Sequence, residues 1–86
     1  MANYSENEII EFLKKRIAQE QGLPIHEIDI NTEFINLGLD SIKAIFILQD
    51  LEKLLGIELN PILMWDYPTI ASFSKYIATN FNLPKN

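Results

Sequence analysis

The sequence contains no cysteine at any of its 86 positions. This absence excludes a disulfide framework, a thiolate metal site and a protein thiol acting as nucleophile. The longest uninterrupted apolar run, residues 44–48, is far shorter than the roughly 20 residues that a membrane-spanning helix needs. Residues 1–6 also lack the basic and apolar regions of a signal peptide. We therefore expect a cytoplasmic chain that does not insert into a membrane.

Basic residues are also scarce, with seven Lys and Arg against twelve Asp and Glu and a net charge of −5. A nucleic-acid partner is excluded on this ground, because bound phosphates must be neutralised by a basic surface. The acidic balance favours basic protein partners, although it also serves solubility alone. We interpret the one basic cluster, Lys14 to Arg16, as a solvated helix face.

Hydrophobic residues make up 48% of the chain and charged residues 22%, which is typical of a globular protein rather than a disordered one. The length fits a single domain over residues 1–86. We expect its core to span about 5–81, with frayed ends at Met1–Tyr4 and Asn82–Asn86. A core and a deep substrate cavity do not both fit, which argues against an enzyme.

A capping box formed by Ser5 and Glu8 predicts a first helix over about 5–20, which Gly22 ends. The next residues, 23–40, show no helical period and form a long loop. The loop is rich in apolar side chains, which predicts that it is pinned across the core. These side chains are Ile25, Ile28, Ile30, Phe34, Ile35, Leu37 and Leu39.

Asp40 is a good N-cap for a second helix that begins at Ser41 and runs to about Leu55. One face of this helix is predicted to join the core: Ala44, Ile47, Leu48, Leu51, Leu54 and Leu55. Three further apolar residues lie on the opposite, solvent-facing side, and they are Ile42, Ile45 and Phe46.

A short helical turn is expected over Pro61–Met64, and a last helix opens at Pro68–Thr69, with Thr69 or Tyr67 as its cap. Its apolar positions recur at helical spacing: Ile70, Phe73, Ile77 and Phe81. No segment shows the alternation of a strand. The predicted fold is all-α, a small four-helix bundle with three main helices, one short helix and a long loop between the first two.

Ser41 is the most informative single position, because it follows a capping acid at the end of a glycine-containing loop. A helix start exposes unpaired N–H groups and partial positive charge, so a phosphate there is favoured. A serine at this place is either accessible for covalent modification or simply part of the cap. The position alone leaves both interpretations open.

The hexapeptide Leu37–Ile42, with the sequence LGLDSI, resembles the attachment motif of acyl carrier proteins. Phe34 matches the loop phenylalanine of that family, and Tyr67–Ile70 matches the YPTI that opens the last helix in polyketide-synthase and peptide-synthetase carriers. Order and spacing agree over about residues 6–80. The chain is thus similar to the phosphopantetheine-binding carrier family of polyketide and non-ribosomal-peptide type.

The resemblance implies that Ser41 is joined by a phosphodiester to 4′-phosphopantetheine, donated by coenzyme A through a phosphopantetheinyl transferase. The thiol of this arm carries acyl groups as thioesters, which suits a chain that has no cysteine of its own. Asp40 matches the acid that helps bind the transferase's metal, and Leu39 and Gly38 complete the cofactor-binding motif. No catalytic residue and no metal site are expected in the carrier itself.

The carrier subtype rests on the stretch Leu59–Ile70, which resembles carriers paired with fatty acyl-AMP ligases, as does Asp50–Glu52. Within that stretch, Ile62 replaces the usual threonine. An acyl-AMP ligase or an acyltransferase is therefore the expected loading partner, in polyketide or mixed polyketide/peptide biosynthesis with synthase or synthetase enzymes. Lys43 and Phe46 stand where carriers of primary fatty-acid synthesis commonly have acids, and that role remains an alternative.

The family contacts its partners through the residue after the serine and those one turn later. The predicted partner-binding residues are Ile42, Ile45, Phe46, Gln49 and Trp65. Two of them have a structural alternative, since Phe46 could fold onto the short helix near Met64 and Trp65 could close the core. We expect a monomer. Two alternatives from other classes are a cofactor-free helical interaction module and a small serine hydrolase; for the latter, His26 is better explained as a surface histidine.

Overall fold

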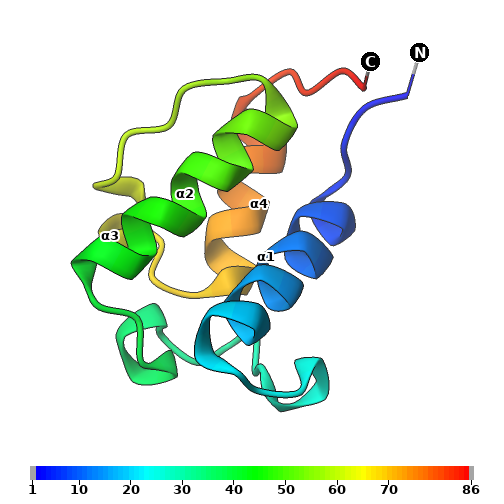
Figure 1. Cartoon of the computed structure of the whole chain (residues 1–86). Helices are drawn as coiled ribbons and strands as arrows, with labels where there is room; N and C mark the ends of the chain where they lie inside the picture. Colours follow the sequence, from blue (N-terminus) through cyan, green and yellow to red (C-terminus); the bar gives the residue numbers. More distant parts are fainter. Residues whose placement is uncertain (1, 86) are drawn as a thin grey trace.

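The computed structural model describes residues 2–85 and contains three long helices and one short one (Figure 1). The α-helices are α1 (Glu6–Gln21), α2 (Ser41–Leu55), α3 (Leu63–Asp66) and α4 (Ile70–Asn80), and two 3₁₀ turns, η1 (Ile25–Glu27) and η2 (Phe34–Leu37), lie between α1 and α2. Within residues 2–85 there are two isolated β-bridges and no strand. The predicted all-α four-helix architecture is confirmed. No helix in this described part is long and apolar enough to cross a membrane.

The helix ends follow the caps that the sequence predicts. Ser5 and Glu8 form a reciprocal capping box, so α1 begins at the next residue, Glu6. Gly22 then ends this helix in the left-handed region at φ 67°, where a side chain would be strained. Thr69 caps α4 in the same reciprocal way, and this settles the choice between Thr69 and Tyr67.

The short helix α3 lies two residues later than predicted. Pro61 stands in a turn that precedes the helix, because the side chain of Asn60 accepts a hydrogen bond from the N–H of Ile62 at 3.0 Å. The N–H of Leu63 then donates to the carbonyl of Asn60 at 3.0 Å. Bonds of α-helical type start only at Ile62, whose carbonyl accepts from Asp66 at 3.1 Å. The proline therefore begins the turn and not the helix.

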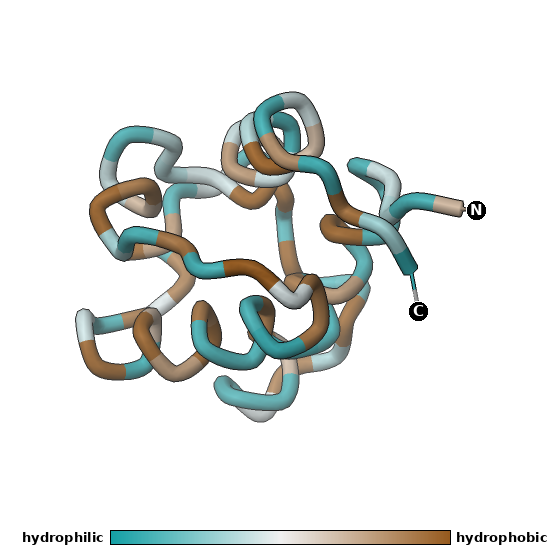
Figure 2. The backbone as a smooth tube through the Cα atoms, turned by 90° about the horizontal axis from the view of Figure 1, so that it is seen from above, coloured by the Kyte–Doolittle hydropathy of each residue, from teal (hydrophilic) through white to brown (hydrophobic). Residues whose placement is uncertain are grey.

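The core is built from one face of each long helix, and hydrophobic and hydrophilic positions alternate along the tube in Figure 2. Fully buried side chains include Ile9, Leu13 and Ile17 of α1, Ile47 and Leu51 of α2, and Ile70, Phe73 and Ile77 of α4. The prediction that Leu54 joins the core is wrong, because its side chain is 36% exposed. It lies roughly 60° around the helix from Leu51, at the edge of the buried stripe.

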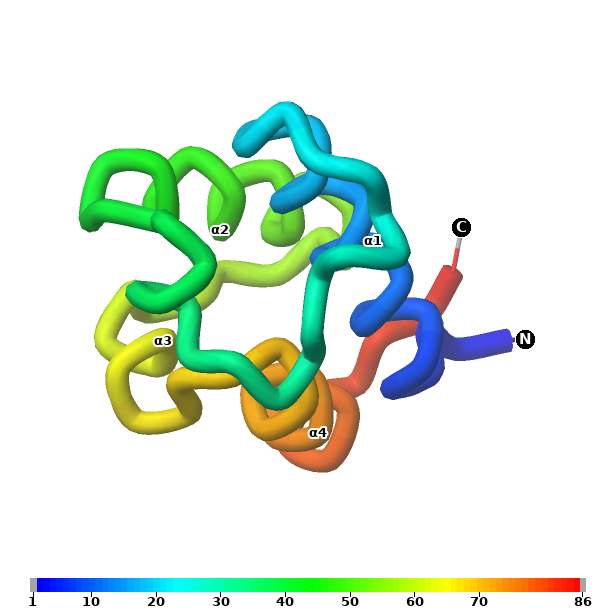
Figure 3. The backbone as a smooth tube through the Cα atoms, turned by 90° about the horizontal axis from the view of Figure 1, so that it is seen from below, coloured from blue at the N-terminus to red at the C-terminus, as the bar shows by residue number. Residues whose placement is uncertain are grey.

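The long loop is pinned across the core in part, and Figure 3 shows it passing from α1 under the start of α4 to α2. Phe34 is buried, and its N–H donates to the carbonyl of Pro68 at 2.8 Å. Ile28 and Leu39 are also buried. Ile25 and Ile35, however, are 41% and 65% exposed, contrary to expectation. Neighbouring residues of a tight 3₁₀ turn point in different directions, so Phe34 faces the core and Ile35 does not.

The expectation of frayed ends is wrong for the residues that the structure describes. The N–H of Tyr4 donates to the carbonyl of Leu83 at 2.8 Å, and the N–H of Lys85 donates to the carbonyl of Ala2 at 3.0 Å. Leu83 is 2% exposed and belongs to the core. The two ends lie side by side in Figure 1. Met1 and Asn86, the outermost residues of the predicted frayed segments, lie outside the described residues.

The basic cluster on α1 is not uniformly a solvated face. Lys15 is exposed, but Arg16 is part-buried and pairs with Asp50 of α2 and Glu20 of α1. The pairing of Arg16 with Asp50, 34 positions away in the sequence, could not be predicted from neighbouring residues alone.

Candidate functional site

Ser41 is exposed at the first position of α2, directly after the N-cap Asp40. Oδ1 of Asp40 accepts a hydrogen bond from the N–H of Lys43 at 2.9 Å, and its main-chain carbonyl accepts from Ala44 at 2.9 Å. Asp40 thereby fixes the first turn of the helix on which the serine stands. The helix start directs N–H groups and partial positive charge toward this end, where an anionic group is stabilised.

The segment before Ser41 is held by a buried residue and a close approach of two chain segments. Leu39 is 5% exposed, and its N–H donates to the carbonyl of Phe34 at 3.3 Å. Phe34 meets Phe73 of α4 edge to face, with ring centroids 6.0 Å apart. Gly38 adopts φ 86°, and a Cβ atom there would lie 2.4 Å from Nε2 of Gln21. The backbone therefore reaches Ser41 from an anchored loop, and the left-handed conformation favours glycine at position 38.

An apolar hollow of about 90 Å³ opens beside Ser41, between the start of α2 and α3. It is lined by Phe34, Ile35, Leu39, Asp40, Ser41, Ala44, Ile45, Pro61, Met64 and Trp65. A more open groove of about 400 Å³ borders the same serine and includes Gly38. The Ser41 hydroxyl thus stands where a capped, polar helix start meets an apolar wall. A group attached there can extend into solvent or along that wall, so the residues present fit a flexible covalent arm.

The predicted partner residues of α2 form one exposed stripe. Ile42, Ile45, Phe46 and Gln49 follow one another at the spacing of a single helix face, and all four are exposed. Ile42 is 65% exposed and Phe46 is 53% exposed. We call these four residues the α2 stripe. Phe46 therefore does not fold onto α3, and that alternative is wrong.

Trp65 of α3 is 63% exposed, so the alternative that it closes the core is wrong as well. Its neighbour Met64 is buried in its place, at 7% exposure. Trp65 lines the hollow beside Ser41 together with Ile45. The structure therefore brings four of the five predicted partner residues around one edge of the helix and places the fifth across the hollow from them.

Two exposed apolar residues of the segments that flank the hollow were missed by sequence reasoning. Ile35, in the 3₁₀ turn before Ser41, was assigned to the core, and Ile62, the N-cap of α3, was noted only for departing from a motif. Ile35 lines the hollow, and Ile62 is 54% exposed. Within residues 2–85 no group of three or more His, Cys, Asp or Glu could hold a metal ion, and His26 is exposed.

A family model described as a phosphopantetheine attachment site matches residues 11–77. The chain belongs to the phosphopantetheine-binding carrier family. Carriers of this family hold a covalently attached 4′-phosphopantetheine and are not enzymes. The prediction of a non-catalytic carrier with this cofactor is thus confirmed.

The relatives are polyketide synthases, and the similar solved structures are acyl and peptidyl carrier proteins. The chain is 35% identical over 72 residues to a component of the phenolphthiocerol/phthiocerol polyketide synthase of Mycobacterium tuberculosis, covering 84% of this chain and 4% of that one. An acyl carrier protein from Anabaena sp. PCC 7120 superposes with a TM-score of 0.83 at 38% identity, covering 92% of this chain and 90% of the other. A free-standing peptidyl carrier protein from Acinetobacter baumannii superposes with a TM-score of 0.81 at 35% identity. The match covers 87% of this chain and 94% of the other.

This carrier is of the polyketide synthase type, and carrier domains in polyketide synthases work with synthase partners. The chain spans about 4% of the length of the mycobacterial synthase component that it matches. That relative's own product is a property of a much larger protein.

Proposed function

We propose that this carrier holds acyl intermediates as thioesters on a 4′-phosphopantetheine arm attached to Ser41, in polyketide or mixed polyketide/peptide biosynthesis. The observation that carries the proposal is the exposed Ser41 hydroxyl at the capped start of α2. In the transfer, the hydroxyl oxygen forms a phosphodiester with the phosphopantetheine of coenzyme A, and adenosine 3′,5′-bisphosphate leaves. The hydroxyl proton passes to a base of the phosphopantetheinyl transferase.

The neighbouring residues have separate roles in this proposal. Asp40 fixes the helix start through Oδ1 and, being exposed, is within reach of a metal-bearing transferase. Gly38 and Leu39 set the path of the backbone into the serine. The positive end of α2 stabilises the phosphodiester charge next to Ser41. The bound arm supplies the thiol that this cysteine-free chain lacks.

The α2 stripe and Trp65 form the proposed docking surface for transferase, loading enzyme and synthase partners. Isolated exposed apolar residues are normal, but a set of this size gathered around one hydroxyl favours an interface. Docking of this kind is weak and fast-exchanging, because a carrier must leave each partner before it can visit the next. We propose that the carrier itself acts as a monomer.

For the loading step we propose an acyl-AMP ligase, which transfers an adenylated fatty acyl group to the thiol of the arm. This step rests on the stretch Leu59–Ile70, in which Ile62 and Trp65 are exposed and Trp65 lines the hollow at Ser41. An acyltransferase is the competing loading enzyme. Charging of the holo carrier by one of the two enzymes, followed by intact-mass measurement, decides between them.

The attachment is tested by incubating the apo carrier with coenzyme A and a broad-specificity phosphopantetheinyl transferase. We expect intact-mass measurement to find a gain of one phosphopantetheine in the wild type and none in Ser41→Ala. Ser5→Ala is the matched control, since it changes another exposed serine at a helix N-terminus and must still be modified. An unmodified wild type would instead support a cofactor-free interaction module.

Two further alternatives give different results in the same preparation. A small serine hydrolase would turn over activated esters as the purified apo protein, and we expect no turnover. A carrier of primary fatty-acid synthesis would be loaded and elongated by the enzymes of that pathway. Exposed Phe46 and part-buried Lys43 stand on α2 where such carriers commonly have acids, so we expect poor loading there.

A further inference from the structure

Gln21, the last residue of α1, touches both sides of the segment that presents Ser41. Its Nε2 group donates a hydrogen bond to the carbonyl of Leu37 at 2.8 Å. Its Oε1 atom accepts one from Nζ of Lys43 at 3.2 Å. Leu37 lies four residues before the serine, and Lys43 lies two residues after it. One amide side chain therefore brackets the attachment position from outside the loop.

The backbone around this contact is shaped to admit the amide. Leu37 ends the η2 turn, and Gly38 follows it in the left-handed region at φ 86°. A Cβ atom at Gly38 would lie 2.4 Å from Nε2 of Gln21, so the side chain passes directly over the glycine. The Leu37 carbonyl has no other hydrogen-bond donor among the described residues. The Gln21 amide is therefore the partner that satisfies this peptide group and fixes the direction of the turn.

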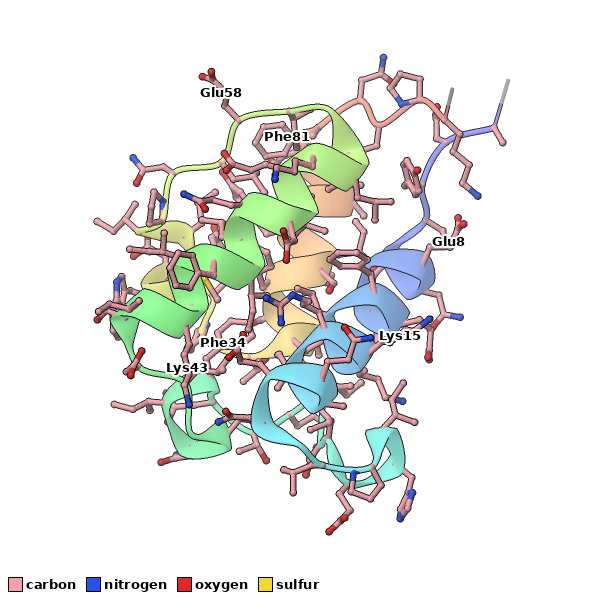
Figure 4. All side chains as sticks on the ribbon, in the orientation of Figure 1. Glu8, Lys15, Phe34, Lys43, Glu58 and Phe81 are labelled. Atoms are coloured by element: carbon pink, nitrogen blue, oxygen red, sulfur yellow. The ribbon has the colours of Figure 1, made fainter. Side chains whose placement is uncertain are left out.

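The Lys43 contact keeps the amide oriented. In Figure 4 the Lys43 side chain leaves the first turn of α2 on the side of the η2 turn. Its ammonium group can only donate, so it selects the oxygen of Gln21 and leaves the NH₂ group facing Leu37. The positions of Lys43 and Ser41 differ by roughly 200° around α2, so the lysine stays clear of the serine hydroxyl.

We propose that Gln21 is a positioning residue for the modification of Ser41, which rests on the attachment role proposed above for that serine. It holds residues 37–43 in the one arrangement that a transferase recognises. Without the hydrogen bond to Leu37, the segment populates other conformations, and a partner that binds only the ordered one sees a lower effective concentration of carrier. The apparent KM for the carrier then rises by the inverse of the ordered fraction, while the chemical step is unchanged.

The test compares Gln21→Glu with Gln19→Glu in phosphopantetheine transfer from coenzyme A. The glutamate at 21 keeps an acceptor for Lys43 but removes the donor to the Leu37 carbonyl. Gln19 is exposed in the same turn of α1, so Gln19→Glu adds the same charge near the same helix end without touching the loop. Loss of one hydrogen bond multiplies the open-to-ordered ratio of the segment about fivefold, so we expect Gln21→Glu to raise KM for the carrier by up to about fivefold, with kcat within about twofold of wild type. Gln21→Met, which adds no charge, is expected to show the same rise.

A second measurement reads the loop directly, by amide hydrogen exchange of the apo protein. The Leu39 N–H bonds to the Phe34 carbonyl across the η2 turn and reports opening of this segment. In Gln21→Glu and Gln21→Met we expect its exchange to accelerate about fivefold, while that of Ile17 and Leu51 in the helices stays at the wild-type rate. Equal acceleration at all three amides would mean general destabilisation and would overturn the proposal.

The kinetic outcomes separate this proposal from the function on which it rests. An unchanged KM in Gln21→Glu, a fall in kcat alone, or the same rise in Gln19→Glu would each overturn the positioning role while Ser41 remains the attachment site. A wild type that gains no phosphopantetheine would overturn the attachment role, and the positioning proposal with it.

Discussion

The Nε–H of Arg16 in α1 donates to Oδ2 of Asp50 in α2 at 2.7 Å and ties the two helices together. Nη1 of the same guanidinium pairs with Glu20, one turn along α1, at 3.1 Å. The bond to Asp50 is the main reason that the pKa of Arg16 is raised above its ordinary value, with a smaller contribution from Glu20. The pair lies at the contact of α1 and α2, so its role is to hold the bundle.

Replacing Arg16 with methionine is expected to lower the free energy of unfolding by about 1 kcal/mol, because both partners keep partial access to water. For a domain of this size that is a fall in Tm of about 4–8 °C. Lys15→Met is the control, since Lys15 is the exposed neighbour labelled in Figure 4. Thermal unfolding followed by circular dichroism measures both. Equal Tm values for the two variants would refute a structural role for the ion pair.

The α2 stripe makes a prediction that separates docking from stability. Phe46→Glu is expected to slow loading by the cognate enzyme about tenfold or more, because an apolar contact is replaced by a charge. Its Tm should stay within about 2 °C of wild type, since the side chain is 53% exposed. Ile25→Glu makes a similar change at an exposed residue of η1, outside the stripe, and should be loaded normally. A collapse of Tm in Phe46→Glu would place this residue in the core.

Features set by neighbours in the sequence could be predicted from the sequence alone. The capping boxes, the glycine stops and the buried faces depend on residues within one or two helical turns, and Ser5, Gly22 and Thr69 behave as their types require. The attachment motif is local as well, which is why Ser41 and Asp40 could be singled out. The prediction that Leu54 is buried was wrong because this residue lies at the edge of the apolar face, and periodicity alone does not say where burial ends.

Features set by distant residues could not be predicted in this way. Arg16 finds Asp50 34 positions away, and Gln21 finds Leu37 16 positions away. The pairing of the chain ends likewise depends on Leu83 entering a core built by other elements. Exposure of Ile35 has the same origin, because its neighbour Phe34 fills the core site first. In the site itself, the motif was therefore predictable and the contacts that orient it were not.

Glu8 connects the first turn of α1 to the C-terminal segment, through a contact that depends on the charge of its carboxylate. Its carboxylate pairs with Lys85 and accepts a hydrogen bond from the N–H of Ser5. Figure 4 shows Glu8 in the first turn of α1, on the side of the chain termini. The Lys85 bond is the main cause that lowers the pKa of Glu8 below its ordinary value of 4.5, followed by the bond from Ser5. A lowered carboxyl pKa stabilises the fold above its ordinary pKa, and this stabilisation is lost as the pH falls through the lowered value.

We therefore expect the amide shifts of Tyr4 and Lys85 to change together on acidification, with a midpoint below 4.5. NMR titration measures the shifts. In Glu8→Gln the transition should be absent and both amides should resemble the acid form at neutral pH. Glu11→Gln, which changes an exposed acid one turn along α1, should leave the transition in place. A midpoint at or above 4.5, or a transition that survives Glu8→Gln, would assign it to another group.

Two serines of α4, two residues apart, predict opposite effects of the same substitution. Ser72 belongs to the capping box, where its Oγ accepts the N–H of Thr69 at 3.1 Å. Ser74 is fully buried, and its Oγ is the one buried side-chain polar atom without a hydrogen-bond partner among the described residues. A buried hydroxyl without a hydrogen-bond partner destabilises the folded state, whereas a hydroxyl that takes part in a helix cap stabilises it.

Ser72→Ala is accordingly expected to lower the free energy of unfolding by about 0.5–1 kcal/mol, because the Thr69 N–H loses its side-chain acceptor while Thr69 itself still caps the helix. Ser74→Ala is expected to raise it by about 0.5–1 kcal/mol, because the unpaired oxygen is removed and alanine is the better helix former. Urea unfolding of both variants and the wild type measures the two changes with one method. The substitution and the helix are the same, so the two sites differ in hydrogen bonding, in burial and in their distance from the helix start. A loss of stability in Ser74→Ala would show that its hydroxyl has a partner after all, such as a buried water.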